Sequence, residues 1–204
     1  MTTRTITGLY DSYEMAVLAV RDLEAAHVPA DDISLVAHQS DTRDVPADKV
    51  HGATVGAETG ASAGAAIGGG AGLLAGLGML AIPGVGPVVA AGWLVAMAAG
   101  AVAGAAAGGT TGGLIGALTS SGVTKEHAGL YAEAVRRGGA LVTARVDDAS
   151  LATAEAIMQR HGRIDPVTRE KAYRDNGWSD FDAKAIPFTP AEVARERALY
   201  ARHS

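Results

Sequence analysis

Two kinds of hydrophobic pattern alternate over the first 38 residues of the chain. Residues 5–10 and 33–37 are short runs rich in β-forming side chains. Between them, Asp11 and Glu14 stand three residues apart, the spacing of a capping box, and predict that a helix begins at Asp11. The apolar positions of this helix recur every three or four residues, at Ala16, Val20 and Leu23. The predicted order is therefore strand, helix, strand.

A similar pattern returns after residue 124. The expected elements are a helix over 125–137 closed by Gly138 and Gly139, a strand over 140–146, a helix capped by Asp147 and ended by Gly162, and a final strand over 163–168. Without the residues in between, the two halves of the chain make βαβ followed by αβαβ. This order predicts an α+β fold, a ferredoxin-like (split βαβ) domain with its helices on one face of the sheet.

Residues 171–204 form a separate C-terminal tail. Residues 189–192 read Thr-Pro-Ala-Glu, the residue types favoured at the N-cap, N1 and N3 positions, and predict a short helix to about Tyr200. Trp178 and Phe181 lie in this tail, although aromatic residues make up only 4% of the chain. The sequence does not indicate what the tail packs against.

The segment between the two halves, residues 52–124, has a different composition. No charged residue occurs between Glu58 and Lys125, and glycine recurs at a strict spacing of four. The positions expected to form a helix-packing and oligomer interface are Gly52, Gly56, Gly60, Gly64, Gly68, Gly72 and Gly76, and then Gly92, Gly100, Gly104, Gly108, Gly112 and Gly116. Residues four apart share one ridge of a helix, so each run makes a groove in which two backbones can touch. Each glycine costs about 1 kcal/mol relative to alanine in an exposed helix, so these helices require close packing.

Two prolines and two glycines interrupt this pattern and predict a chain reversal. The turn residues are Pro83, Gly84, Gly86 and Pro87. We therefore expect a glycine-zipper helical hairpin with helices over 52–82 and 88–121. Its tip is the most apolar part, and the residues expected to contact a membrane or to pack at the tip are Leu77, Leu80, Ile82, Val85, Val88 and Trp93.

Composition narrows the function classes. The formal net charge of −5 argues against a surface that follows nucleic-acid phosphates. The chain has no cysteine, which excludes disulfides and thiolate metal sites, and its first residues have no apolar run of signal-peptide length. The expected organisation is the first half of the α/β domain over 1–51, the hairpin over 52–124, the second half over 125–170 and the tail over 171–204.

No residues have the spacing of a catalytic, cofactor or metal site. Residues 70–75 match a loose dinucleotide-binding pattern, but inside a glycine run instead of after a strand. The histidines lack the spacing of metal ligands. Arg136 and Arg137 read as a solvated helix end, with contact to anionic lipid head groups as the alternative. We therefore expect a protein that is not an enzyme and that has no cofactor.

Four short motifs carry a family resemblance. They are Ile6–Asp11, Asp32–Val36, Ile82–Pro87 and Gly138–Val142. Through them the chain resembles the bacterial general stress protein 17M-like family, which includes heat- and low-temperature-induced stress proteins. The resemblance covers most of residues 4–165. It implies stress-induced expression and membrane association, and it supplies no catalytic residues.

The expected function is that of a stress-response protein that self-assembles through its hairpin. Its partners would be other copies of itself and membrane lipid, with no nucleic acid, at the cytoplasmic side of the bacterial inner membrane. The alternative is a cytoplasmic homo-oligomeric or filamentous scaffold, in which the hairpins bury one another without lipid.

Overall fold

One five-stranded antiparallel sheet runs through the described part of the chain. The structure, a computed structural model, describes residues 3–39, 73, 77–82, 84–98 and 113–200. Its elements are β1 (Thr3–Tyr10), α1 (Tyr13–Ala25), the 3-10 turn η1 (Ala30–Asp32), β2 (Ile33–His38), β3 (Gly78–Ile82), β4 (Gly86–Gly92), α4 (Leu114–Ser120), α5 (Lys125–Arg136), β5 (Ala140–Asp147), α6 (Leu151–Arg160), α7 (Pro166–Asp175) and α8 (Pro190–Tyr200). The strand order is β1-β5-β2-β4-β3, with every neighbouring pair antiparallel. The chain is therefore a mixed α/β protein, as the sequence predicts.

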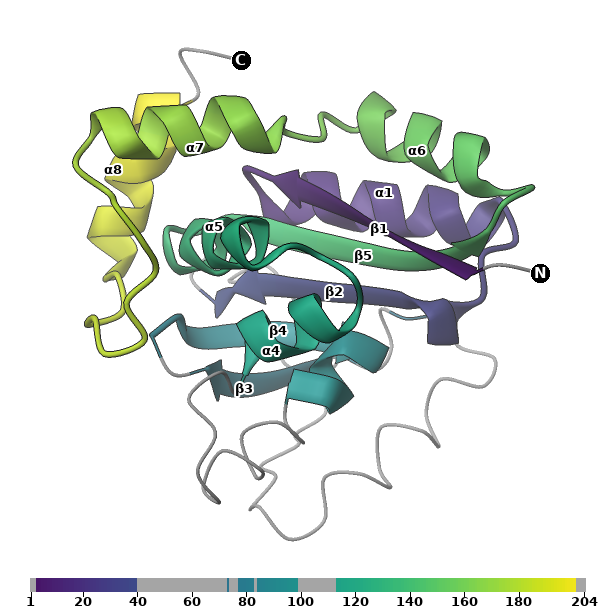
Figure 1. Cartoon of the computed structure of the whole chain (residues 1–204), viewed down its shortest axis with the longest axis horizontal. Helices are drawn as coiled ribbons and strands as arrows, with labels where there is room; N and C mark the ends of the chain where they lie inside the picture. The colour runs from purple at the N-terminus through teal and green to yellow at the C-terminus, as the bar shows by residue number, and fades with distance from the viewer. Residues whose placement is uncertain (1–2, 40–72, 74–76, 83, 99–112, 201–204) are drawn as a thin grey trace, which may run out of the picture.

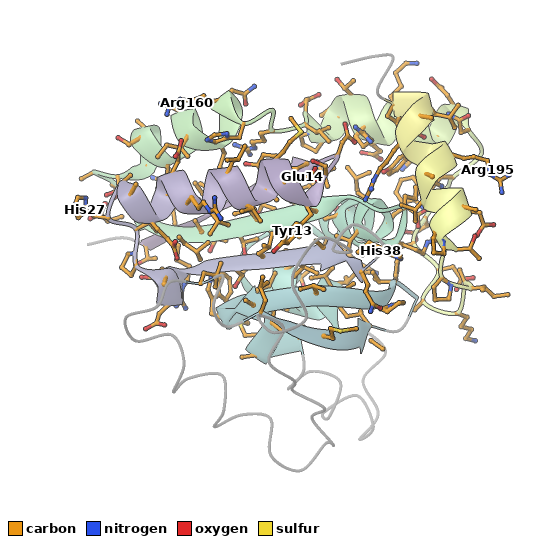
Figure 2. The ribbon with its side chains drawn as sticks, turned by 180° about the vertical axis from the view of Figure 1, so that it is seen from behind. Tyr13, Glu14, His27, His38, Arg160 and Arg195 are labelled. Carbon is orange, nitrogen blue, oxygen red and sulfur yellow. The ribbon has the colours of Figure 1, made fainter. Side chains whose placement is uncertain are left out.

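Helices cover both faces of this sheet. Figure 1 shows α4 and α5 in front of the sheet and α1 behind it, and Figure 2 shows the α1 side. Side chains of α1 and α6, such as Val20 and Ile157, share one core with Leu35, whereas Leu130 of α5 shares the other core with Leu141. The expectation of helices on one face is wrong. Every residue of β2 is buried, so this strand presents apolar side chains to both faces, and both require a covering layer.

The predicted helical hairpin is not confirmed. Residues 78–82 and 88–92, expected to be helical, lie in the strands β3 and β4 instead. Antiparallel pairing of β4 with β2 buries Val88 in one core and Val89 in the other. Burial of neighbouring residues on opposite faces requires the two-residue period of a strand, so tertiary packing overrides the helical pattern here.

The predicted chain reversal is present as a β-turn. Ile82 pairs with Gly86, and the amide of Val85 donates to the carbonyl of Ile82 at 3.0 Å. Gly84 and Gly86 have φ of +76° and +104°, conformations that glycine adopts at little cost. Pro87 is the second residue of β4 and is exposed, and Pro83 lies outside the described residues.

Two of the predicted interface glycines lie in the described part of the chain. Gly92 ends β4 with φ of +95° and is therefore not on a helical ridge, although residues 93–98 after it are helical. Gly116 lies in α4. The predicted positions outside the described residues are Gly52, Gly56, Gly60, Gly64, Gly68, Gly72, Gly76, Gly100, Gly104, Gly108 and Gly112. No helix within the described ranges has the length and apolar character needed to cross a membrane.

Two predicted helix caps take other roles. The N-cap of α1 is Ser12, whose hydroxyl accepts from the amide of Met15 at 3.3 Å, so the capping box at Asp11 is wrong. Asp147 accepts from the amide of Ser150 at 2.8 Å and so closes the turn before α6, for which Ser150 is the N-cap.

The predicted strand over 163–168 is reduced to a single bridge. Ile164 pairs with Leu9 at the β1 edge of the sheet. Asp165 then caps α7 by accepting from the amide of Thr168, and Pro166 occupies the first turn of that helix. The strand does not continue past the bridge, because the Asp165 cap and Pro166 favour a helix immediately after it.

Residues 166–200, called the C-terminal segment below, fold back across one end of the sheet. The predicted start of α8 is confirmed, since the carboxylate of Glu192 accepts from the amide of Thr189 at 2.7 Å. In Figure 1, α8 stands beside the left-hand end of the sheet, and α7 leads to it along the top. This placement supplies the partner that the sequence does not indicate.

Candidate functional site

A cluster of arginines and aromatic rings lies where the C-terminal segment meets α5. The fully buried carboxylate of Glu133 accepts from Arg136 Nη2 and Arg137 Nε, each at 2.6 Å. Arg137 Nη1 donates to Glu196 Oε2 at 2.8 Å, and its guanidinium lies 4.4 Å from the centroid of the Tyr173 ring. Burying a carboxylate costs several kcal/mol unless it is paired. Arg137 satisfies that requirement and also joins α5 to α7 and α8.

Arg169 makes a second link between the segment and the domain. Its Nη2 donates to Asp11 Oδ1, just after β1, at 2.7 Å. Its guanidinium lies 4.5 Å from the centroid of the Tyr200 ring, and the rings of Tyr173 and Tyr200 meet edge to face at 5.5 Å. Cation–π contacts of this kind strengthen when water is excluded. Arg169 therefore fixes α7 to the end of β1 and to α8 at once.

Arg137 and Tyr173 keep their charge states over the ordinary pH range. Burial lowers the pKa of Arg137, but its hydrogen bonds to Glu133 and Glu196 outweigh burial and leave the pKa above its usual value. Burial raises the pKa of the Tyr173 phenol, which therefore stays neutral beside the two arginines. The contact between these two side chains therefore does not change with pH near neutrality.

Glycines on the domain side allow the C-terminal segment to approach closely. A Cβ atom on Gly86 would lie 2.7 Å from Pro187 Cβ, and one on Gly138 would overlap Val193. The same holds for the turn between β3 and β4, where a Cβ on Gly84 would lie 2.9 Å from the Phe181 ring. Any larger side chain at these positions would push the segment away.

The space at the centre of the cluster is too small for a substrate. The cavity has a volume of about 10 Å³ and is lined by Tyr10, Arg137, Arg169, Tyr173 and Tyr200, among others. About one water fits such a volume, whereas ligand pockets enclose roughly 300–1,000 Å³. Within the described ranges no group of histidine and carboxylate side chains is placed to hold a metal ion. The arrangement is a packing interface within one chain.

A second contact fixes the helical residues 93–98 to the sheet. Trp93 Nε1 donates to the carbonyl of Asp32 at 3.1 Å, and the guanidinium of Arg145 lies 4.7 Å from the centroid of the Trp93 ring. The amide of Leu94 donates to the buried hydroxyl of Ser34 at 2.8 Å. Trp93, expected to contact a membrane or to pack at the tip, is thus a half-buried contact of the helical residues 93–98 with η1 and β5.

Four of the other five predicted tip residues belong to the cores of the domain. Leu77, Ile82, Val85 and Val88 are buried, and Leu80 lies in β3. Leu77 packs in the core beneath α1, whereas Ile82, Val85 and Val88 pack in the core beneath α4 and α5. The structure therefore divides these residues between two faces of the sheet and does not gather them into an apolar tip.

The sequence does not predict the cluster around Glu133. Its pattern favours a solvated helix end at Arg136 and Arg137, yet both side chains are only 11% exposed. One signal was present, since Glu133 lies three and four residues before them on the same helix face. The residues contributed by the C-terminal segment, Arg169 and Glu196, carry no comparable local signal.

His38 leads to a prediction about pH. This buried residue ends β2, on the side of the molecule where α8 lies (Figure 2), and burial together with the nearby charge of Arg197 lowers its pKa. A histidine in the unfolded chain has a pKa of about 6.5. As the pH falls through this value, the unfolded chain binds more protons than the folded chain, so the free energy of unfolding falls. We expect His38→Gln to remove this contribution, which amounts to at most about 1.4 kcal/mol per pH unit.

The measurement is urea unfolding of both proteins at about pH 7.5 and about pH 5.5. His127→Gln, at a partly exposed position on α5, is the matched control and should keep the wild-type pH dependence. An equal loss of stability on acidification in wild type and His38→Gln would contradict the prediction.

Comparisons of the chain with protein-family models, with curated protein sequences and with solved structures found no match. The stress-protein resemblance therefore stays an expectation from the sequence motifs.

Proposed function

We propose that this protein is a non-enzymatic stress-response protein that self-associates through its glycine-rich runs, with the α/β domain as their carrier. The observation that carries the proposal is the spacing of four among the glycines of residues 52–76 and 100–112. In a helix this spacing offers backbone-to-backbone contact along one ridge. The stress role itself is supported by the sequence resemblance alone.

The described residues next to these runs support the role of the domain as a carrier. The amide of Leu73 donates to Glu24 Oε1 of α1 at 2.6 Å, and Leu77 is buried in the same core. Ala98 and Leu114, which flank the second run, are buried in the core on the other face of the sheet. Because the described ends of the two runs lie in different cores, we propose that the runs pair with those of other copies.

This proposal requires no contact with lipid. The expectation of membrane contact rests on an apolar tip of the predicted hairpin. The tip residues whose side chains are described are buried or half-buried within the domain. The glycine-rich runs themselves consist mostly of alanine, glycine, serine and threonine. Such a composition suits close packing between helices more than contact with acyl chains.

We also propose that the domain is ferredoxin-like, with β3 and β4 as an addition at the β2 edge. The supporting observation is the order Ile164 bridge, β1, β5, β2. Here α1 connects β1 to β2 past β5, and α6 connects β5 to the bridge past β1, with both helices in the same core. That order and the shared face are those of the split βαβ arrangement.

The proposed self-association is tested by placing bulk in each glycine groove. Gly64→Leu and Gly104→Leu should reduce the particle to the 20.5 kDa mass of one chain, as measured by size exclusion with light scattering. Ala66→Leu and Ala106→Leu are matched controls, because they add leucine two residues later, on the opposite side of a helix. The controls should keep the wild-type mass. If the glycine variants also keep it, or if the wild type has the mass of one chain, the proposal fails.

A further inference from the structure

The C-terminal segment touches parts of the domain that are far apart in the sequence. Arg169 bonds Asp11 after β1, and Arg197 Nη2 donates to the carbonyl of Gly138 after α5 at 2.6 Å. The loop between α7 and α8 lies against the β3–β4 turn, where Ala183 and Pro187 are in close contact with Gly84 and Gly86. Figure 1 shows this loop descending beside the ends of β4 and β3. One segment thus covers the turn of the strand pair that adjoins the glycine-rich runs.

We propose that the C-terminal segment is a strap that holds the β3–β4 hairpin in the sheet and thereby limits self-association. Release of the strap frees the hairpin and the runs beside it for contact with other copies. The second part rests on the proposed self-association, whereas the hold on the hairpin is independent of it.

The contacts of the strap are suited to release as a unit. Its internal contacts are aromatic, since Tyr173 packs edge to face on both Trp178 and Tyr200, at 6.1 and 5.5 Å between centroids. Its contacts with the domain combine the burial of Tyr173 and Tyr200 in the core beneath α5 with two ion pairs, Arg137–Glu196 and Arg169–Asp11. The Asp11 side chain is 31% exposed, so salt weakens its ion pair, whereas it does not weaken the packed rings.

The connection to the rest of the chain also permits release. Between α6 and α7, the backbone hydrogen bond from Ile164 to the carbonyl of Leu9, at 2.8 Å, ties the linker to the sheet. Gly162, with φ of +77°, precedes it. The loop of the strap is open to solvent on its far side, where Ile186 is 85% exposed. Release therefore withdraws Tyr173 and Tyr200 from the core beneath α4 and α5, while the linker stays attached to β1.

A disulfide lock tests the proposal in the full chain. A Cβ on Gly129 of α5 would lie 3.8 Å from Phe181 Cβ in the strap, the separation found in disulfides, and the chain has no other cysteine. We would compare Gly129→Cys/Phe181→Cys protein in its oxidised and reduced forms, which differ only in the lock. Oxidation should slow hydrogen exchange over residues 78–92 at least about tenfold and should reduce the mass of the assembled particle.

A charge reversal tests the opposite direction. Glu196→Lys places a cation beside Arg137 and should open the strap, speeding exchange over residues 78–92 about tenfold and increasing the particle mass. Glu170→Lys is the matched control, because Glu170 pairs with Arg174 inside α7 and does not touch the domain through that pair. The control should exchange like the wild type.

The two readouts separate the two parts of the proposal. Unchanged exchange over residues 78–92 in both the locked and the charge-reversed proteins would overturn the strap. Exchange that responds without any change in particle mass would overturn its control of association. Failure of the self-association proposal itself is seen separately, as a wild-type particle with the mass of one chain.

Discussion

Gly92→Ala is expected to lower the free energy of unfolding by roughly 2 to 6 kcal/mol. Gly92 has φ of +95°, a conformation that costs other residues about 1 to 3 kcal/mol. A Cβ there would also collide with the carbonyl oxygen of Ile33 and lie 2.7 Å from Ser34 Cα, backbone atoms that cannot move aside without disturbing β2. On a helical ridge, by contrast, alanine would raise stability by about 1 kcal/mol. The sign of the change in the free energy of unfolding, measured with urea, therefore shows whether Gly92 ends a strand or lies on a helix.

Gly122→Ala is the matched control for this experiment. Gly122 has nearly the same φ, +97°, but nothing lies within 4 Å of its added Cβ. It should show only the conformational part of the loss, about 1 to 3 kcal/mol. A loss at Gly92 no larger than that at Gly122 would contradict the close approach of β4 to β2, and a gain at Gly92 would contradict the strand.

Glu133→Ala is expected to cost about 3 to 5 kcal/mol. The substitution leaves Arg136 and Arg137, each 11% exposed, without the fully buried carboxylate that both contact at 2.6 Å. Two like charges then face each other at a boundary largely closed to water. Glu133→Gln should cost less than alanine, because an amide oxygen still accepts one hydrogen bond. Urea unfolding followed by circular dichroism provides the measurement.

Glu155→Ala on α6 makes the same chemical change at an exposed position of a helix interior. It should change stability by no more than about 0.5 kcal/mol. Should Glu133→Ala cost as little as this control, the buried cluster would not be what attaches the C-terminal segment to α5.

The stability and association experiments address different parts of the chain. Gly92→Ala and Glu133→Ala act on the sheet and on the contact with the C-terminal segment, so both are expected to lower stability in a single copy. Gly64→Leu and Gly104→Leu act on the runs and should change particle mass while the domain stays folded. If every one of these variants changed both the stability and the particle mass, the glycine runs would be packed inside their own domain. That result would contradict the proposal of contact between copies.

Elements whose signals lie close together in the sequence were predictable. The helix predicted over 125–137 is present as Lys125–Arg136, and Gly138, with φ of +101°, follows it. The next strand spans Ala140–Asp147, and the capping box at Thr189 starts α8 as expected. In each case the cap, the glycine or the alternation acts on neighbouring residues, and no distant contact is needed to stabilise the outcome. The sequence also specified the chain reversal at Gly84 and Gly86, although not the kind of element that it joins.

Features that depend on contacts between residues far apart in the sequence were decided only by the tertiary structure. Val88 and Val89 fit a helix pattern until β2 offers a strand partner and two cores to bury them. Ser12, and not Asp11, caps α1, and the Asp11 carboxylate is paired with Arg169 from the other end of the chain. The cluster around Glu133 forms because the C-terminal segment excludes water from it, and exclusion of water by a distant segment leaves no periodic trace in a sequence. Local propensity fixed the turns and caps, whereas burial against partners far along the chain fixed the sheet and the candidate site.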